Sequence, residues 1–491
     1  MTENERPNIV FINTDQQRYD TIGALGFDYA DTPNLDTLVA EGVNFSGCYA
    51  NSPVCGPTRA ALFSGISPHA SGKLHNGARW DDCWIRDLAQ SGYHCVNVGK
   101  MHTQPMDEKF GFHERYVVEN KDRSQIPAKF LDELDKAILA HNLEKPGGNT
   151  YSRDVPDYEQ NLGAYEWPLP AHLHPDNFVG DTALRWIDMA SHEYRVKKPI
   201  FLEIGFPGPH PPYDPTGDDL DGMYGREYPL LPVTDEELAS QPQELREFRS
   251  HQESFPYDSV WFDAKASDER RQRLWAYYNA NMRMIDRKIG EIMSTLRSNG
   301  FLENAVVIFS SDHGDNLGDH GLSQKWNMYE QSVHVPLVVW SSGLFPGGRE
   351  VSDLYSWFDI GATVLELAGL SVPKHFEAIS LLPALRDELG AKGRKVVFSE
   401  VARDQVMQTV EYCVMARDHE WKYIEYLGDD LGQLFSMIED PNELVNLWND
   451  SNYADVRDKY AKAVHSWIIR SDIHASLRFA GPGIRSDLFD D

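Results

Sequence analysis

The stretch Asn8-Ile9-Val10-Phe11-Ile12-Asn13-Thr14-Asp15-Gln16 begins with an apolar, β-branched run and ends on two side chains that carry oxygen atoms. Such a run is typical of a buried strand in a parallel sheet. Polar side chains directly after a strand of this kind lie at the carboxyl edge of the sheet, where open α/β sheets bind their ligands. The stretch therefore predicts a central strand of an α/β sheet, with Asp15 and Gln16 at its functional edge.

The same pattern recurs along the chain. Further apolar runs occupy residues 96–98, 200–205, 306–310 and 336–340. Lys100 and His102 follow the first of these, His210 the second, and Asp312-His313 the third. Because the carboxyl ends of parallel strands meet at one edge, residues that are far apart in sequence are expected to converge on one site.

Helical patterns alternate with these runs, most clearly over residues 268–298, where apolar residues recur at helical spacing before Asn299-Gly300. This alternation predicts an α/β fold, in which a large, mostly parallel or mixed sheet is sandwiched by helices. Two irregular stretches, about 104–177 and 211–263, are expected to roof the site. After about residue 385 the strands become shorter and amphipathic. We therefore expect a catalytic domain over residues 1–385, followed by a smaller α+β subdomain with a short antiparallel sheet and a tail over residues 386–491.

Composition limits the function classes. The chain has 491 residues, 41% of them hydrophobic, and a formal net charge of −30, which argues against binding of nucleic acid over a broad surface. An apolar run of membrane-spanning length is missing from the sequence, and the N-terminal residues do not resemble a leader peptide, so a cytoplasmic protein without a membrane partner is expected. Five scattered cysteines give no disulfide framework, which fits a reducing compartment.

The pentapeptide Cys55-Gly56-Pro57-Thr58-Arg59 has a spacing that should arise by chance about 0.01–0.02 times in a chain of this composition. Pro57 suits a first helical turn, and residues 59–63 would continue that helix. The pentapeptide also fits an ordinary buried cysteine at the start of a helix. Its meaning depends on the other segments around it.

Taken together, these segments resemble the sulfatase branch of the alkaline-phosphatase superfamily, close to arylsulfatases and phosphonate monoester hydrolases. The likeness spans nearly the whole chain. It is carried by 8–16, Thr32-Pro33-Asn34-Leu35-Asp36, the pentapeptide at Cys55, Gly99-Lys100-Met101-His102, Gly208-Pro209-His210-Pro211-Pro212, Ser311-Asp312-His313-Gly314-Asp315, Lys325, and the C-terminal Gln433-Leu434-Phe435-Ser436-Met437 with Asp440-Pro441-Asn442-Glu443.

The resemblance implies a nucleophile and a metal site. Cys55 would be oxidised by a formylglycine-generating enzyme, and the resulting hydrated aldehyde would attack sulfur with one hydroxyl and expel sulfate with the other. Asp15, Gln16, Asp312 and His313 match the metal ligands of the family. The resemblance implies Ca²⁺ as the ion. Gln16 departs from the common Asp-Asp pair by supplying a neutral oxygen, and His313 supplies a nitrogen, so Mn²⁺ is the alternative.

The resemblance also assigns proton carriers and cations. Arg59, Lys100 and Lys325 would hold the nucleophile and the sulfate oxygens. His102 would act as the base that releases sulfate, and His210 as the acid that protonates the leaving group. Asn76 is a candidate substrate contact, although an asparagine before glycine also fits a plain turn.

Three functions remain open at this point. The first is a metal-dependent hydrolase of a small or aryl sulfate ester. The second is a phosphonate monoester or phosphodiester hydrolase with the same nucleophile and metal, against which the pair Lys100 and His102 argues, since such hydrolases tend to replace it. The third is a non-catalytic binder of sulfated ligands, which the intact set of candidate residues disfavours. A homo-oligomer also remains open.

Overall fold

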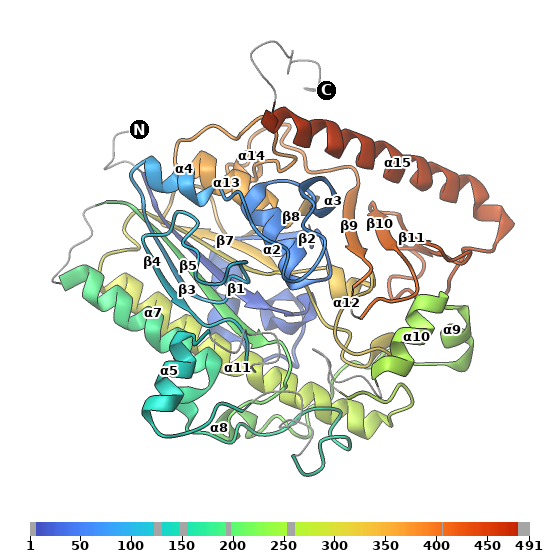
Figure 1. The fold of residues 1–491 in the computed structure, drawn as a ribbon, viewed down its shortest axis with the longest axis horizontal. Coiled ribbons are helices and arrows are strands. Elements are labelled where there is room, and N and C mark those ends of the chain that lie inside the picture. The colour runs from blue at the N-terminus through green and yellow to red at the C-terminus, as the bar shows by residue number, and fades with distance from the viewer. Residues whose placement is uncertain are drawn as a thin grey trace.

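The computed structural model describes residues 6–121, 130–146, 155–192, 198–252, 261–404 and 406–479, and within them it forms an eight-stranded sheet and a four-stranded sheet (Figure 1). The large sheet has the order β4-β3-β5-β1-β6-β7-β2-β8. Its strands are β1 (Asn8–Asp15), β2 (Val43–Tyr49), β3 (His94–Gly99), β4 (Glu114–Val117), β5 (Ile200–Pro209), β6 (Ala305–Ser311), β7 (Leu337–Ser341) and β8 (Arg349–Ser356).

The large sheet is mixed, and β1 lies at its centre. Strand β1 pairs in parallel with β5 on one side and with β6 on the other, and β3 pairs in parallel with β5 and β4. Strand β7 runs antiparallel to both β6 and β2. The predicted α/β fold with a mostly parallel or mixed sheet is confirmed.

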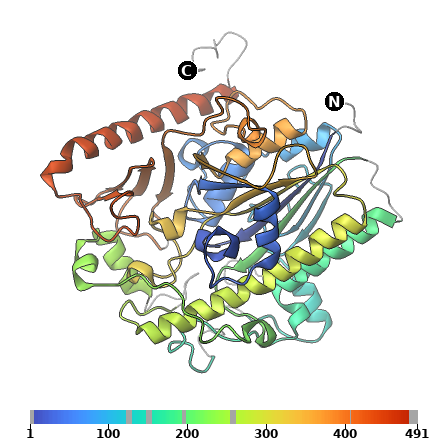
Figure 2. The same cartoon turned by 180° about the vertical axis from the view of Figure 1, so that it is seen from behind.

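Helices cover both faces of this sheet. The side chains of β1 alternate between the two apolar cores that lie between the sheet and these helices. Val10 and Ile12 join the core beneath α1 (Pro33–Glu41), α7 (Pro175–His192) and α11 (Asp268–Ser298), and α11 crosses this face in Figure 2. Ile9 and Phe11 join the opposite core, beneath α2 (Cys55–Ser64), α4 (Ile85–Gln90), α13 (Asp359–Leu367) and α14 (Leu382–Leu385). Apolar residues on both faces explain the continuous hydrophobic run from which the strand is predicted.

The small sheet has the order β12-β11-β10-β9 and is antiparallel throughout. Its strands are β9 (Val397–Ala402), β10 (Tyr412–Arg417), β11 (Trp421–Leu427) and β12 (Gln433–Ser436). The long helix α15 (Ala454–Ser476) lies across one face of it, where Tyr460 and Val464 pack on Val414 and Tyr423 (Figure 1). The expected small C-terminal antiparallel sheet is therefore present, while the boundary at residue 385 stays a prediction. The tail from residue 480 onward lies outside the described residues.

Strands β2, β4, β8 and β12 and several short helices lie outside the predicted elements. Strand β8 is an edge strand with polar, exposed side chains in its first half, and β4 has four residues, so neither gives a strong apolar signal. The remaining helices are α3 (Pro68–Ser71), α5 (Glu133–Ala140), α8 (Gly217–Leu220), α9 (Asp235–Ser240), α10 (Gln243–Gln252) and α12 (Glu330–Val333). Within the described parts of the chain, none of the helices combines the length and the apolar character that crossing a bilayer requires.

Candidate active site

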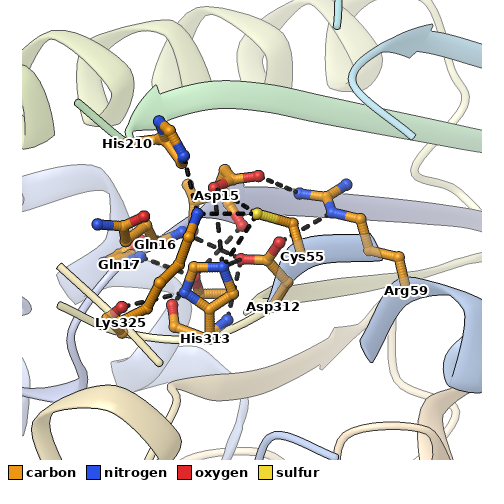
Figure 3. A network of polar contacts seen from close by, with 12 residues as sticks. Asp15, Gln16, Gln17, Cys55, Arg59, His210, Asp312, His313 and Lys325 are labelled. Atoms are coloured by element: carbon orange, nitrogen blue, oxygen red, sulfur yellow. Dashed lines mark hydrogen bonds and ion pairs between the residues drawn. The ribbon is translucent and has the colours of Figure 1, made fainter. Parts of the chain in front are cut away.

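Cys55, the first residue of α2, lies beside the carboxyl ends of β1 and β6 (Figure 3). Its Sγ is 3.2 Å from His313 Nε2, 3.0 Å from Lys325 Nζ and 3.7 Å from Asp15 Oδ1. One ligand atom each of Asp15, Cys55, Asp312 and His313 lies within 4.8 Å of the other three, and all four residues are buried. The strand ends that carry Asp15 and Asp312-His313 thus meet, as predicted, and the segments that carry Cys55 and Lys325 join them.

Arg59 lies one helical turn after Cys55 and faces the same cluster. Its Nε donates to Asp312 Oδ2 at 2.8 Å, and its Nη2 donates to Asp15 Oδ2 at 3.2 Å. Its Nη1 donates to the carbonyl of Lys100 at 3.0 Å. A guanidinium holds two carboxylates in fixed orientation through such paired hydrogen bonds, so Arg59 aligns the two acidic side chains of the cluster.

Gln16 adds an oxygen to this cluster. Its backbone adopts a positive φ of 69°, its amide nitrogen donates to Asp312 Oδ1 at 3.0 Å, and its Nε2 donates to Asp315 Oδ2 at 2.6 Å. Its buried Oε1 has no hydrogen-bond partner among the described residues. A buried carbonyl oxygen without a partner is costly, so this atom needs a ligand that the protein does not supply.

The tautomer of His313 leaves its outer nitrogen available. Nδ1 donates to the carbonyl of Gly314 at 3.0 Å, so Nε2 keeps its lone pair, and this atom faces Cys55. A ligating histidine is commonly oriented by a hydrogen bond of this kind at its other nitrogen. Two carboxylates, one amide oxygen and one imidazole nitrogen therefore fit a divalent cation, with Asp15, Gln16, Asp312 and His313 as the residues that would hold it.

Positive charge surrounds the nucleophile position. Lys100 Nζ lies 2.7 Å from Asp15 Oδ2 and, like Lys325, is fully buried. Burial alone would raise the pKa of the Cys55 thiol, but Lys325 and Lys100 hold that pKa well below its usual value. The start of α2 adds the positive end of a helix dipole. The site is therefore built to stabilise negative charge in an acidic protein.

His210 and Lys325 form a pair next to Cys55. Lys325 Nζ donates to His210 Nε2 at 2.8 Å, and His210 Nδ1 donates to the carbonyl of Pro211 at 2.7 Å. The amide nitrogen of His210 donates to the carbonyl of Asp15 at 3.0 Å, which fixes this residue to the end of β1. A proton can pass between the ammonium and the imidazole at this distance.

His102 and Asn76 complete the predicted set. His102 has a positive φ of 61°, its side chain hydrogen-bonds to Cys55, and its buried Nδ1 has no partner among the described residues. Asn76 Oδ1 accepts from the amide nitrogen of Gly56 at 2.9 Å, so Asn76 caps the start of α2 beside the nucleophile position. All eleven predicted site residues therefore lie in one region. Their individual roles stay predictions.

Sequence reasoning missed the residues that hold this set in place. Asp315 accepts hydrogen bonds from Gln16 and from Tyr213 Oη, and Glu119 and Asn120 contact His102 and Lys100. Asp315 follows the predicted Asp312-His313 pair and could have been found from that position. Glu119 and Asn120 follow a four-residue strand in an irregular stretch, where the sequence carries no periodic signal.

Comparisons with known proteins agree with this geometry. Residues 7–370 match the model of the sulfatase family, and residues 318–469 match the model described as N-sulphoglucosamine sulphohydrolase, C-terminal. An arylsulfatase of Clostridium perfringens is 28% identical over 93% of this chain and 93% of its own, and a choline-sulfatase of Rhizobium meliloti is 29% identical over 90% of this chain and 82% of its own.

The fold has a counterpart among solved structures. The phosphonate monoester hydrolase of Agrobacterium radiobacter superposes with a TM-score of 0.77 at 24% identity, covering 95% of this chain and 96% of that one. The family match spans most of the chain and includes every strand of the large sheet. The chain belongs to the sulfatase family, within the alkaline-phosphatase superfamily, and is a sulfatase-type enzyme.

Proposed function

We propose that this protein hydrolyses a small or aryl sulfate ester to sulfate and an alcohol or phenol. The observation that carries the proposal is the cluster around Cys55, in which a nucleophile position at a helix start faces two carboxylates, an imidazole and two buried lysines. The names of the relatives, an arylsulfatase and a choline-sulfatase, support a small leaving group.

Formylglycine, made from Cys55 by a formylglycine-generating enzyme, would supply a hydrated aldehyde with one hydroxyl to attack sulfur and a second to expel sulfate. In that form an oxygen takes the place of Cys55 Sγ. Lys325 and Lys100, at the distances given above, would stabilise the charge on the transferred group. His102 would accept the proton of the second hydroxyl as the bond from carbon to the sulfate oxygen breaks, which leaves the aldehyde and free sulfate. Addition of water to the aldehyde would restore the hydrate.

The His210 and Lys325 pair would serve the leaving group. When the bond from sulfur to the ester oxygen breaks, that oxygen takes a proton from the pair and leaves as an alcohol or phenol. Because Lys325 donates to His210 Nε2, the proton is shared between a lysine and a histidine rather than held by His210 alone.

A divalent cation bound by Asp15, Gln16, Asp312 and His313 would polarise the nucleophile and neutralise charge on the sulfate oxygens. We propose Ca²⁺, because three of the four donors are oxygens, with Mn²⁺ as the alternative because imidazole suits it. Metal analysis of the purified protein, followed by chelation and separate addition of each ion, distinguishes the two.

A phosphonate monoester or phosphodiester hydrolase is the second candidate. Its support is the fold shared with a phosphonate monoester hydrolase and the Gln16 that departs from the common aspartate pair. The pair of Lys100 and His102 beside Cys55 favours the sulfatase. Both transition states present anionic equatorial oxygens to the same cations, three for a sulfate monoester and two for a phosphonate monoester, so some activity on the second ester class is expected.

The test is hydrolysis of 4-nitrophenyl sulfate by protein whose conversion at Cys55 has been measured by peptide mass, with Cys55→Ala as the control. We expect turnover that follows the converted fraction and disappears in Cys55→Ala. Fully converted, metal-loaded protein that matches the Cys55→Ala control on sulfate, phosphonate and phosphodiester substrates would instead indicate the binder of sulfated ligands.

A further inference from the structure

Three consecutive buried residues, Glu119, Asn120 and Lys121, follow the edge strand β4; we call them the 119–121 segment. Their exposed fractions are 1%, 8% and 3%. Charged side chains are rarely buried to this degree without specific partners. Glu119 and Asn120 contact members of the proposed catalytic set, and Lys121 contacts the segment after His210. These contacts form although β4 is an edge strand and Cys55 lies beside the central strand β1.

Glu119 holds the backbone of the proposed base. Its Oε2 accepts from the amide nitrogen of His102 at 2.9 Å. His102 has a positive φ, a conformation that a residue other than glycine adopts only when its surroundings enforce it. A charge-assisted hydrogen bond to this amide supplies such enforcement, so Glu119 fixes where the His102 ring lies.

Asn120 holds a proposed sulfate-binding cation. Its Oδ1 accepts from Lys100 Nζ at 2.9 Å, while the same Nζ pairs with Asp15. The carbonyl of Asn120 in turn accepts from Lys145 Nζ at 3.0 Å. Lys100 is thus held between Asp15, a candidate metal ligand, and the 119–121 segment.

Lys121 holds the segment that carries His210. Its Nζ donates to Asp214 Oδ1 at 2.8 Å and to the carbonyl of Pro212 at 3.2 Å, both of which follow His210. The same Nζ lies 3.8 Å from Asp176 Oδ2, and Asp176 Oδ1 accepts from the amide nitrogen of Gly208, which precedes His210. His174 Nε2 is a further contact of Asp214 at 3.4 Å.

We infer that the 119–121 segment is a positioning unit for the reaction, and that its outer members serve different steps. Glu119 sets the position of His102 for sulfate release, and Lys121 sets the position of His210, with its Lys325 partner, for protonation of the leaving group. Asn120 joins them by orienting Lys100. The inference rests on the proposed function, because it assigns the two steps to His102 and His210.

The two roles predict opposite kinetic signatures. Release of sulfate follows cleavage of the ester bond, so loss of Glu119 should lower kcat and leave kcat/KM nearly unchanged, with a burst of the first product. Protonation of the leaving group takes place during cleavage, so loss of Lys121 should lower kcat/KM. That loss should be larger for phenyl sulfate than for 4-nitrophenyl sulfate, since the poorer leaving group needs the proton more.

The experiment compares Glu119→Leu and Lys121→Met with the wild type, using converted, metal-loaded protein and both esters. Glu119→Gln is the rescue variant, because its amide oxygen still accepts from the His102 amide. Glu133→Gln and Lys136→Met alter an exposed ion pair on α5 and are the matched controls. If Lys121→Met does not fold, the double variant Lys121→Met/Asp214→Asn is used in its place, because it removes both charges of the buried Lys121–Asp214 ion pair.

We expect Glu119→Leu to lose about 10-fold or more in kcat with a burst of nitrophenol, and Glu119→Gln to restore it. We expect Lys121→Met to lose a similar factor in kcat/KM, with the larger loss on phenyl sulfate. Equal losses in both parameters for both variants, without dependence on the leaving group, would overturn the inference and leave a merely structural role.

Crystal structures of the variants give a readout that does not need turnover. We expect the His102 ring to move in Glu119→Leu and the 208–214 segment to move in Lys121→Met. If the His102 ring keeps its position in Glu119→Leu and the His210 ring keeps its position in Lys121→Met, the inference is overturned, even if the enzyme is active. A wild type that hydrolyses none of the esters would overturn the proposed function alone, because the positions of the two rings would still decide whether the segment holds them.

Discussion

Arg59 connects the nucleophile helix to both acidic metal-ligand candidates, Asp15 and Asp312. Lysine at position 59 would keep the charge but could not donate to both carboxylates at these angles. In the Cys55→Ala background, where conversion at position 55 plays no part, we expect Arg59→Lys to weaken Ca²⁺ binding about 10–100-fold. Titration calorimetry checks this, with the exposed Arg86→Lys as control. Unchanged affinity would mean that Arg59 does not orient the ligands.

Glu203, on β5 beneath the site, gives a pH-dependent contribution to stability. Burial raises its pKa from 4.5 to about 7, against the opposing effect of Arg59. The folded state therefore binds more protons than the unfolded state between these values, and the free energy of unfolding should fall as the pH rises from about 4.5 to 7.

Glu203→Gln removes this titration and should flatten that part of the profile. Urea midpoints at pH 5 and pH 7.5 measure the difference for both proteins. An identical pH dependence in the variant and the wild type would contradict the assignment to Glu203.

At the scale of elements, α11 also supports α1. Asp286 of α11 accepts from the amide nitrogen of Leu35 at 2.8 Å and from that of Asn34 at 3.1 Å, in the first turn of α1, which its own N-cap residue Thr32 does not cap. Asp286→Ala should lower the free energy of unfolding by about 1–2 kcal/mol. Denaturant unfolding checks this against the exposed Ser294→Ala in the same helix. Equal midpoints for the two variants would show that the long-range cap has no effect.

The elements that the sequence predicts are those whose apolar residues form a long helical repeat or a continuous run. The 31 residues of α11 agree with the predicted helix over 268–298, and β1, β5 and β6 carry continuous apolar runs because both of their faces are buried. Strand ends then place Asp15, Lys100, His210 and Asp312 correctly, since parallel strands share a carboxyl edge.

The elements that sequence could not predict depend on tertiary contacts. Glu119 and Lys121 look like ordinary surface charges until the fold buries them against His102 and the 208–214 segment. Strand β8 has an exposed, polar first half, so its pairing with β2 leaves no apolar pattern to read. The Lys325 and His210 pair likewise joins two loops whose approach no local pattern encodes.

At the scale of the molecule, Lys422 of the small sheet connects it to the segment that follows Lys325. Its fully buried Nζ lies 2.7 Å from Glu330 and from Glu443 and donates to the carbonyl of Met328 at 3.0 Å. Removing this cation takes the lysine partner from the buried Glu443 and leaves Glu330 with the more distant Arg417, so Lys422→Met should cost about 3–5 kcal/mol of stability.

Urea unfolding measures this cost, with the exposed Lys459→Met as the control, for which about 0–1 kcal/mol is expected. A loss of unfolding free energy in Lys422→Met no larger than that in Lys459→Met would show that the contact between the small sheet and the segment after Lys325 does not stabilise the fold.

We propose that the cluster at Cys55 hydrolyses sulfate esters. The most direct test compares kcat/KM for 4-nitrophenyl sulfate with kcat/KM for a phenyl phosphonate monoester, using one preparation of converted, metal-loaded protein. We expect a clear preference for the sulfate ester, and we expect Cys55→Ala to lose the activity. Dominant turnover of the phosphonate ester would contradict this proposal and transfer the protein to the phosphonate hydrolases that share its fold.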